Sequence, residues 1–198
     1  MSLPHLPAFN IHGVVPPVRP GQDGASGERS PYRVDLLTFC QHFGVSSPRR
    51  SILRGLLELR SQLAAAGKQE GFQWINGSFT EDVEGQQNRA PNDVDVVTFI
   101  SFGDAAAKMD LLQNFQDLVN PQRSKLRFKV DHYLVPTDVP LTIEYAQTLA
   151  YWSSLWSHRR GDNRWKGFVA VPLASNDADA RAWLEQADGA TDPGGETP

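Results

Sequence analysis

Hydrophobic positions along the chain fall into segments of helical spacing and segments of strand spacing. The clearest helical segment is 46–67, which has Ser46 or Ser47 as a suitable N-cap. Pro48 suits its first turn, and Gly67 suits its end. The large apolar side chains of this segment recur every three or four residues: Ile52, Leu53, Leu56, Leu57 and Leu63. This spacing predicts an amphipathic helix with one buried face.

Six further segments continue the alternation of strands and helices. Aromatic and branched residues at strand spacing occupy residues 72–76, 93–100, 126–135 and 165–173. Apolar residues at helical spacing occupy residues 104–119 and 142–158. Because strands and helices alternate along the chain, we predict an α/β or α+β fold.

The composition divides the 198 residues into one domain and two ends. Residues 1–31 contain six of the 14 prolines and four of the 16 glycines, which is typical of an extended arm. Residues 174–198 contain six acidic residues and one arginine, and the last ten have too little apolar area to become ordered. We therefore predict an arm, a domain at 32–173 and an acidic, largely disordered tail, with a short helix near 177–188.

Charge and cysteine content exclude several classes of protein. The chain carries a net charge of −4, so any contact with nucleic acid must be local rather than an overall basic surface. No apolar run has the roughly 18 residues of a membrane span, and no signal peptide is recognisable, which predicts a cytoplasmic protein with no membrane partner. The one cysteine, Cys40, cannot form an internal disulfide and is expected in the core.

Three aspartates on predicted strands are the candidates for chemistry. Asp93 and Asp95 are two residues apart, so their side chains share one face of a strand. The pattern of the next strand places Lys129, Asp131 and Tyr133 on one face, so Asp131 would complete a group of three carboxylates with a lysine beside it. Such hard oxygen ligands suit Mg²⁺ or Mn²⁺ together with substrate phosphates. The pattern predicts phosphoryl or nucleotidyl transfer, although Asp93 alone is also ordinary turn chemistry before a strand.

A Gly-Ser turn precedes these aspartates. Gly77 and Ser78 stand directly after the predicted strand 72–76. A glycine there lets the backbone approach phosphate oxygens, and the serine hydroxyl adds a hydrogen-bond donor. Together, the turn and the Asp-x-Asp strand form a two-part signal for nucleotide binding.

The residues NGSF at 76–79 and PNDVDVV at 91–97 resemble the signature of the DNA polymerase beta-like nucleotidyltransferase superfamily. NGSFT, PNDVD, the later WKGF and the Pro-rich opening also resemble a small, poorly characterised bacterial group of nucleotidyltransferase-like proteins, over about residues 7–173. The resemblance implies a minimal nucleotidyltransferase fold, a mixed sheet with helices packed against it. The 14 residues between Ser78 and Asp93 are slightly more than the superfamily pattern, and EDVEGQQN has the character of an inserted surface loop.

The resemblance also implies an activity. Gly77 and Ser78 would hold the phosphates of an NTP, and Asp93, Asp95 and Asp131 would be catalytic residues that bind two Mg²⁺ or Mn²⁺ ions. The NMP would pass to a hydroxyl of a protein or tRNA acceptor, in a bacterial toxin–antitoxin or phage-defence setting. The alternative is a non-catalytic antitoxin or sensor that keeps the fold and binds a nucleotide, or a protein partner through its arm or tail.

One dense basic run follows the last predicted helix. It contains Arg159, Arg160, Arg164 and Lys166 within residues 158–166. Such runs are usually solvated loops, but beside an acidic metal site this one would hold a triphosphate or an RNA acceptor. We therefore include Arg160 and Lys166, with Lys129, among the expected nucleotide-binding residues. Trp152 and Trp156 are four residues apart on the preceding helix, where core packing is the simplest interpretation and stacking on a nucleobase the alternative.

Overall fold

The structure is a computed structural model that describes residues 5–189. Five strands form one mixed sheet in the order β1-β5-β2-β3-β4. The strands are β1 (Tyr32–Arg33), β2 (Phe72–Asn76), β3 (Val94–Ile100), β4 (Val130–Pro136) and β5 (Val169–Pro172). β1 pairs parallel with β5, and β3 with β4, whereas β2 runs antiparallel to both of its neighbours.

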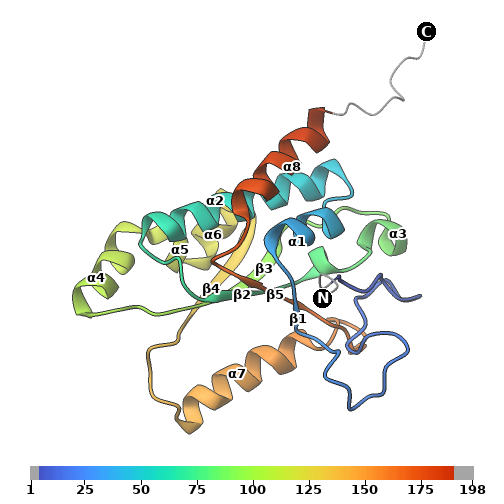
Figure 1. Cartoon of the computed structure of the whole chain (residues 1–198), viewed down its shortest axis with the longest axis horizontal. Coiled ribbons are helices and arrows are strands. Elements are labelled where there is room, and N and C mark those ends of the chain that lie inside the picture. The colour runs from blue at the N-terminus through green and yellow to red at the C-terminus, as the bar shows by residue number, and fades with distance from the viewer. Residues whose placement is uncertain (1–4, 190–198) are drawn as a thin grey trace.

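Helices cover both faces of this sheet (Figure 1). They are α1 (Leu36–Phe43), α2 (Ser47–Ala65), α3 (Val83–Gln87), α4 (Ala105–Asn114), α5 (Gln116–Val119), α6 (Pro121–Phe128), α7 (Ile143–Trp156) and α8 (Asp177–Gly189), with a 3-10 turn η1 (Ser78–Thr80). α1, α2, α6 and α8 lie on one face, and α7 lies alone across the other. This arrangement confirms the predicted α/β fold class. None of the helices within residues 5–189 has the length and apolar character of a membrane span.

Each face of the sheet has its own core. The larger core packs the apolar stripe of α2, which includes Leu53 and Leu56, against Ile75, Val96 and Val130 of the strands. A smaller, aromatic core lies under α7. It contains Trp74, Val97, Phe99, Val135, Leu149, Trp152, Trp156 and Phe168. Alternate residues of β2 and β3 therefore serve opposite layers, as strand geometry requires.

The predicted helix at 46–67 and the strand at 72–76 are confirmed, but the segment from 126 to 135 differs from prediction. α6 continues to Phe128, and β4 begins only at Val130. Asn120 caps α6 by accepting a hydrogen bond from the Arg123 amide, and a proline follows it in the first turn. These start signals outweigh the alternating pattern of residues 126–129, so the strand prediction was too long at its beginning.

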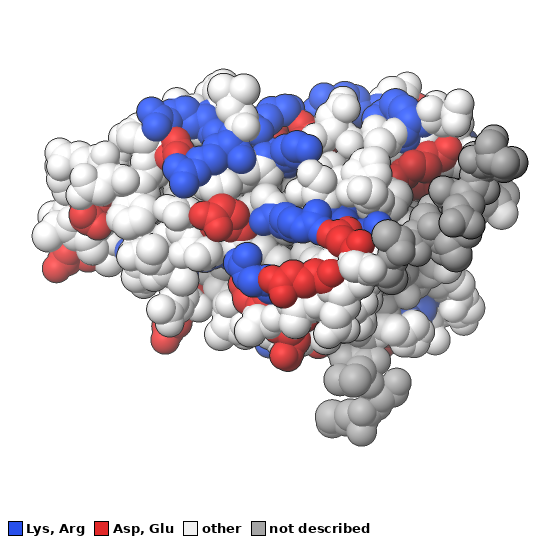
Figure 2. Space-filling model, turned by 90° about the horizontal axis from the view of Figure 1, so that it is seen from above, with Lys and Arg blue, Asp and Glu red and all other residues white. Residues whose placement is uncertain are grey.

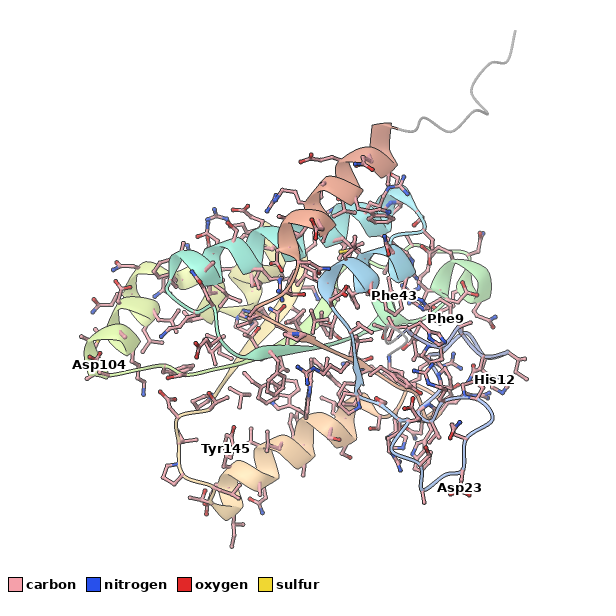
Figure 3. The ribbon with its side chains drawn as sticks, in the orientation of Figure 1. Phe9, His12, Asp23, Phe43, Asp104 and Tyr145 are labelled. Atoms are coloured by element: carbon pink, nitrogen blue, oxygen red, sulfur yellow. The ribbon has the colours of Figure 1, made fainter. Side chains whose placement is uncertain are left out.

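The arm is extended, and it is anchored to the domain. Val14 and Val15 are fully buried, and the Gly167 amide donates to the Val15 carbonyl over 2.6 Å. Phe9 packs against Phe43 of α1 with ring centroids 6.1 Å apart (Figure 3). Segment 5–31 therefore forms part of the tertiary structure rather than a separate appendage.

The predicted acidic tail begins with a helix that belongs to the fold. α8 packs on α1 and α2 and buries Ala180 and Leu184. Arg60 of α2 forms an ion pair with Asp177 over 2.6 Å. The domain therefore extends past the predicted boundary at 173. The prediction relied on the high acidic content of this segment, and that content does not reveal the apolar residues that α8 buries. The rest of the predicted disordered tail, 190–198, lies outside the described residues.

Candidate functional site

The three predicted carboxylates lie at one end of the sheet. In the pairing of β3 with β4, Asp95 stands opposite Asp131, and in the pairing with β2 it stands opposite Asn76. Asp93 precedes β3 by one residue. All three aspartates line a cavity of about 1120 Å³, together with Gly77 and Ser78. The strand register thus brings the two parts of the sequence signal to the same cavity.

The Gly77 turn lies directly against the Asp95 carboxylate. Gly77 has φ +88°, a backbone conformation that side chains rarely adopt. A Cβ atom at this position would lie 2.9 Å from both Cγ and Oδ2 of Asp95. Backbone conformation and space therefore both require glycine here, and the absence of a side chain brings the turn close to the carboxylate.

The negative charge of the Asp95 carboxylate is disfavoured where it lies, first by burial and then by its neighbours. Burial, and then the carboxylates of Asp93 and Asp131, raise the pKa of Asp95 to about 6, while Lys166 and Lys125 act in the opposite direction. A raised pKa means that the site disfavours the ionised carboxylate as it stands. A cation bound between these oxygens would offset that penalty, and carboxylate oxygens are the type of ligand that a hard divalent metal takes.

A lysine takes up part of this charge. The Lys125 ammonium, from α6, lies 2.5 Å from Oδ2 of Asp93, and this contact raises the pKa of Lys125. Within residues 5–189, no three His, Cys, Asp or Glu side chains stand together as a metal-binding group. The ligand set of Asp93, Asp95 and Asp131 therefore stays a prediction, and in it the lysine and a metal would share the Asp93 carboxylate.

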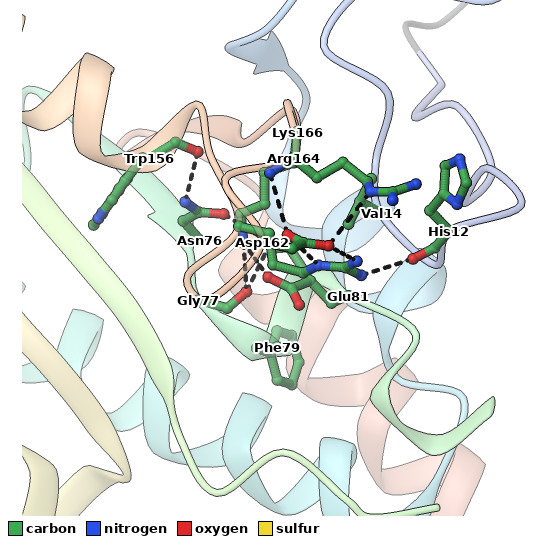
Figure 4. A network of polar contacts seen from close by, with 12 residues as sticks. His12, Val14, Asn76, Gly77, Phe79, Glu81, Trp156, Asp162, Arg164 and Lys166 are labelled. Carbon is green, nitrogen blue, oxygen red and sulfur yellow. Dashed lines mark hydrogen bonds and ion pairs between the residues drawn. The ribbon is translucent and has the colours of Figure 1, made fainter. Parts of the chain in front are cut away.

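A second lysine, Lys166, is buried and forms a hydrogen bond with the Gly77 turn (Figure 4). Lys166 donates from Nζ to the Gly77 carbonyl over 3.1 Å and forms an ion pair with Glu81 over 2.5 Å. Burial lowers the pKa of Lys166, while Glu81 and Asp95 oppose that change. The ammonium is thus occupied by protein groups, and it holds Gly77 in place beside Asp95. If Lys166 contacts a nucleotide as predicted, it does so in addition to its bonds with Gly77 and Glu81.

The other cations of the predicted basic run are also partly neutralised. Asp162 forms ion pairs with both Arg159 and Arg164, and Arg159 also donates to the His12 carbonyl over 2.8 Å. Arg160 is exposed, lines the cavity and forms no ion pair within residues 5–189. Of the four basic residues in the run, Arg160 is therefore the best placed to contact a phosphate.

Lys129 does not lie where the sequence pattern predicted. It is the left-handed C-cap of α6, with φ +58°, and its Nζ donates to the Ser51 hydroxyl over 3.0 Å. It is absent from the lining of the cavity. The predicted strand position of Lys129 was wrong, because the residue ends a helix instead of entering a strand, and its nucleotide contact stays a prediction that the position does not favour. Lys125, one helical turn earlier, reaches the site in its place.

The two tryptophans of α7 pack mainly in the aromatic core. Trp152 and Trp156 form an edge-to-face pair with centroids 5.5 Å apart, and Trp156 also contacts the Phe168 ring. The Trp156 side chain is buried, and its carbonyl accepts a hydrogen bond from Asn76 over 3.0 Å. Core packing therefore accounts for the positions of both tryptophans. Trp156 is also one of the residues that line the cavity.

Sequence reasoning missed two side chains that shape the site, Lys125 and Glu81. The Asn-Pro pair at 120–121 is a helix start signal, and a helix from there would have placed Lys125 before β4. Glu81 gives no comparable signal, because its partner Lys166 is 85 residues away.

The fold and the cavity together define a class: an α/β protein whose mixed sheet presents three aspartates beside a glycine turn. Residues 7–172 match a family of unknown function, DUF6932, and the chain belongs to that family. Comparison with curated proteins found no match, and comparison with solved structures found none either.

Proposed function

We propose that this protein is a metal-dependent nucleotidyltransferase that moves an NMP from an NTP to an acceptor hydroxyl. The observation that carries the proposal is the meeting of Asp93, Asp95 and Asp131 with the Gly77–Ser78 turn at one cavity. The cavity, at about 1120 Å³, is large enough for a nucleoside triphosphate and part of an acceptor. The resemblance to the nucleotidyltransferase signature supports the same assignment.

The aspartates would hold the metal, Mg²⁺ or Mn²⁺, as two ions. Asp93 and Asp95 would bind the ion that carries the triphosphate, and Asp95 and Asp131 the ion at the acceptor hydroxyl. When bound, the ions would stabilise charge on the attacking and leaving oxygens. The raised pKa of Asp95 supports this role, because burial and then the carboxylates of Asp93 and Asp131 disfavour its ionised form, which a bound cation would favour.

The transfer itself exchanges one phosphorus–oxygen bond for another. The acceptor oxygen would bond to the α-phosphorus while the bond to the β-phosphate oxygen breaks, so that pyrophosphate leaves. Asp95 and Asp131 would activate the acceptor hydroxyl and favour loss of its proton, which would pass to solvent water. The Gly77–Ser78 turn would orient the phosphates, and Arg160 and Lys125, both on the cavity wall, would offset the charge of pyrophosphate. Positioning and electrostatics would thus supply the catalysis.

The proposal is tested by binding and by transfer. Melting temperature should rise with Mn²⁺ plus an NTP, and much less with either alone, because a ligand that binds only the native state stabilises it. Incubation with each labelled NTP, with and without bulk tRNA, should label RNA or protein. Asp93→Asn and Asp95→Asn should abolish both effects, whereas Asp179→Asn, exposed on α8, should change neither. An unchanged melting shift in the two site variants would contradict the proposal.

One observation favours a second function, nucleotide binding without transfer. The Lys125 ammonium already pairs with Asp93 and would serve as the cation of a site that binds a nucleotide but no longer reacts. The same assays separate the two functions. A melting shift with an NTP alone, insensitive to Mn²⁺ and without labelled product, would support the binding module.

A further inference from the structure

α6 and its C-cap carry four cations, which lie on more than one side of the helix. Residues 121–129 contain Arg123, Lys125, Arg127 and Lys129, and no acidic residue. The side chains of the first three are 55%, 52% and 52% exposed. Each of these three forms an ion pair, but half of its side chain stays exposed, so an anion in solvent can approach it.

α2 adds to these cations. A Cβ atom at Gly55 of α2 would lie 1.7 Å from the Phe128 carbonyl oxygen, so the backbones of α2 and α6 are in close contact there. Lys129 bridges the two helices through Ser51, one turn before Arg54. Figure 2 shows Lys and Arg side chains gathered over the helical layer. We name this area, made of Arg50, Arg54, Arg123, Arg127 and Lys129, the α2–α6 surface.

The α2–α6 surface keeps a positive surplus after its ion pairs are counted. Arg123 and Arg127 share one carboxylate, that of Asp117. In the same way, Arg50 and Arg54 share the carboxylate of Asp188. The remaining cation, Lys129, is bonded to a neutral hydroxyl. Five cations against these two carboxylates and that of Glu58, one turn after Arg54 on α2, leave a local charge of about +2 on a chain whose net charge is −4.

The same helix connects this surface to the cavity. Lys125, between Arg123 and Arg127 on α6, lines the cavity at Asp93. Arg89, which is exposed, lines the cavity as well. A polyanion that reaches from the α2–α6 surface past α6 would therefore find Lys125 and Arg89 beside the aspartates, which would otherwise repel it.

We propose that the α2–α6 surface binds the phosphates of a single-stranded nucleic acid and directs its hydroxyl end into the cavity as acceptor. The acceptor role rests on the proposed nucleotidyl transfer, whereas the binding itself does not. A nucleic acid supplies one negative charge per nucleotide along its whole length, which matches cations spread over two helices. The guanidinium groups of Arg54, Arg123 and Arg127 are also suited to bidentate contacts with phosphate oxygens.

The test uses a triple variant that leaves each shared carboxylate with one partner: Arg54→Gln, Arg127→Gln and Lys129→Gln. A control variant loses three exposed cations elsewhere: Arg29→Gln, Arg33→Gln and Arg181→Gln. Both variants change the net charge by −3, so a difference in their affinity for nucleic acid must come from where the removed cations lie. Binding is measured in the full chain with fluorescent 20-nucleotide RNA and DNA strands at several salt concentrations.

We expect the triple variant to raise the Kd at least about 10-fold, with a log–log salt dependence shallower by roughly 2, because each lost phosphate contact on a single strand removes about 0.7 from the slope. The control variant should bind nearly as the wild type does. Equal weakening in both variants, or no binding of either strand by the wild type, would overturn the proposal and favour a protein acceptor.

The melting shift with Mn²⁺ plus an NTP separates this proposal from the proposed activity. None of the three substituted residues lines the cavity, so the triple variant should keep the full shift. Selective loss of nucleic-acid binding in a protein that shows no nucleotide-dependent shift would support the surface and contradict the transferase. Loss of the shift in the triple variant, with the control intact, would overturn the surface as a site separate from the cavity.

Discussion

The backbone of Gly77 lies against the side chain of Asp95, at the distance where a single added carbon would collide with the carboxylate. The pairing of β2 with β3 sets this relationship, because it places Asn76 opposite Asp95. The chain then turns away at Gly77 with φ +88°. The turn proposed to hold phosphate and the carboxylate proposed to hold metal are thus fixed by one pair of strands, and a change in either position alters the other.

Gly77→Ala should damage both stability and nucleotide binding. The new Cβ would meet Cγ and Oδ2 of Asp95 at 2.9 Å, and the residue would keep an unfavourable positive φ. We expect a loss of about 2–3 kcal/mol in the free energy of unfolding, from strain and contact together. Nucleotide affinity should fall at least about 10-fold, measured by thermal shift. Ser78→Ala, which removes only a hydroxyl, should be milder.

Gly67→Ala is the matched control for the backbone effect. Gly67 follows α2 with φ +71°, and a Cβ atom there would meet nothing within 4 Å. This variant should lose only about 1 kcal/mol in stability and keep its nucleotide affinity. If both alanine variants behave alike, the contact with Asp95 has no separate effect.

Asp95→Asn should stabilise the protein while it abolishes metal and nucleotide binding. Because the folded-state pKa of Asp95 is raised from 3.8 to about 6, its ionised form is disfavoured in the fold. Its favourable contribution is complete below pH 4 and is lost as pH rises through 6. At pH 7.5 we expect the variant to be more stable by about 1–2 kcal/mol, allowing for partial solvent access. Urea unfolding without metal measures this difference.

The pH dependence of the difference between wild type and Asp95→Asn isolates this carboxylate. Buried His132 acts in the opposite direction, because burial lowers its pKa to about 4 and its contribution is lost as pH falls from 6.5. That effect is common to both proteins and cancels in the difference. The stability advantage of Asp95→Asn should therefore shrink between pH 7.5 and pH 4.5. A constant advantage over that range would contradict the raised pKa.

The sequence predicts the part of the site that depends on local geometry. Gly77 and Ser78 directly follow one strand, and Asp93 and Asp95 stand at the start of the next, so short-range patterns suffice to bring them to one edge of the sheet. Asp131 follows from strand alternation, which holds from Val130 onward. These positions require only the period of a strand and the chemistry of a turn.

The remaining parts depend on contacts between distant segments. The pair of Glu81 with Lys166 joins the end of η1 to the segment before β5, and nothing near either residue indicates the partner. Residues 126–129 alternate in the manner of a strand, yet they complete a helix whose Leu126 is 87% exposed. Tertiary packing and the Asn120 cap make these residues helical, since intrinsic helix or strand propensity alone is a weak guide.

Lys166→Met should destabilise the protein more than Glu81→Gln does. Removing the lysine leaves the Glu81 carboxylate buried without its partner and takes one hydrogen bond from the Gly77 carbonyl, which keeps those from Thr80; we expect a cost of about 3 kcal/mol. The double variant should recover part of this loss, because no buried charge then stands alone. Urea denaturation of the four proteins gives the coupling energy. Additive losses would show that the two side chains act independently.

Lys125→Met should strengthen metal binding in the absence of nucleotide. The Lys125 ammonium lies 2.5 Å from the Asp93 carboxylate, so it competes with any cation for that oxygen. An exposed ion pair contributes up to about 1 kcal/mol, and removing the competitor should lower the Kd for Mn²⁺ about 5-fold. Arg123→Met is the control, because Arg123 lies on the same helix and pairs with Asp117 instead. Titration of each protein with Mn²⁺, followed by electron paramagnetic resonance, measures the Kd. Weaker Mn²⁺ binding by Lys125→Met would show that the lysine positions Asp93 for the metal rather than competing with it.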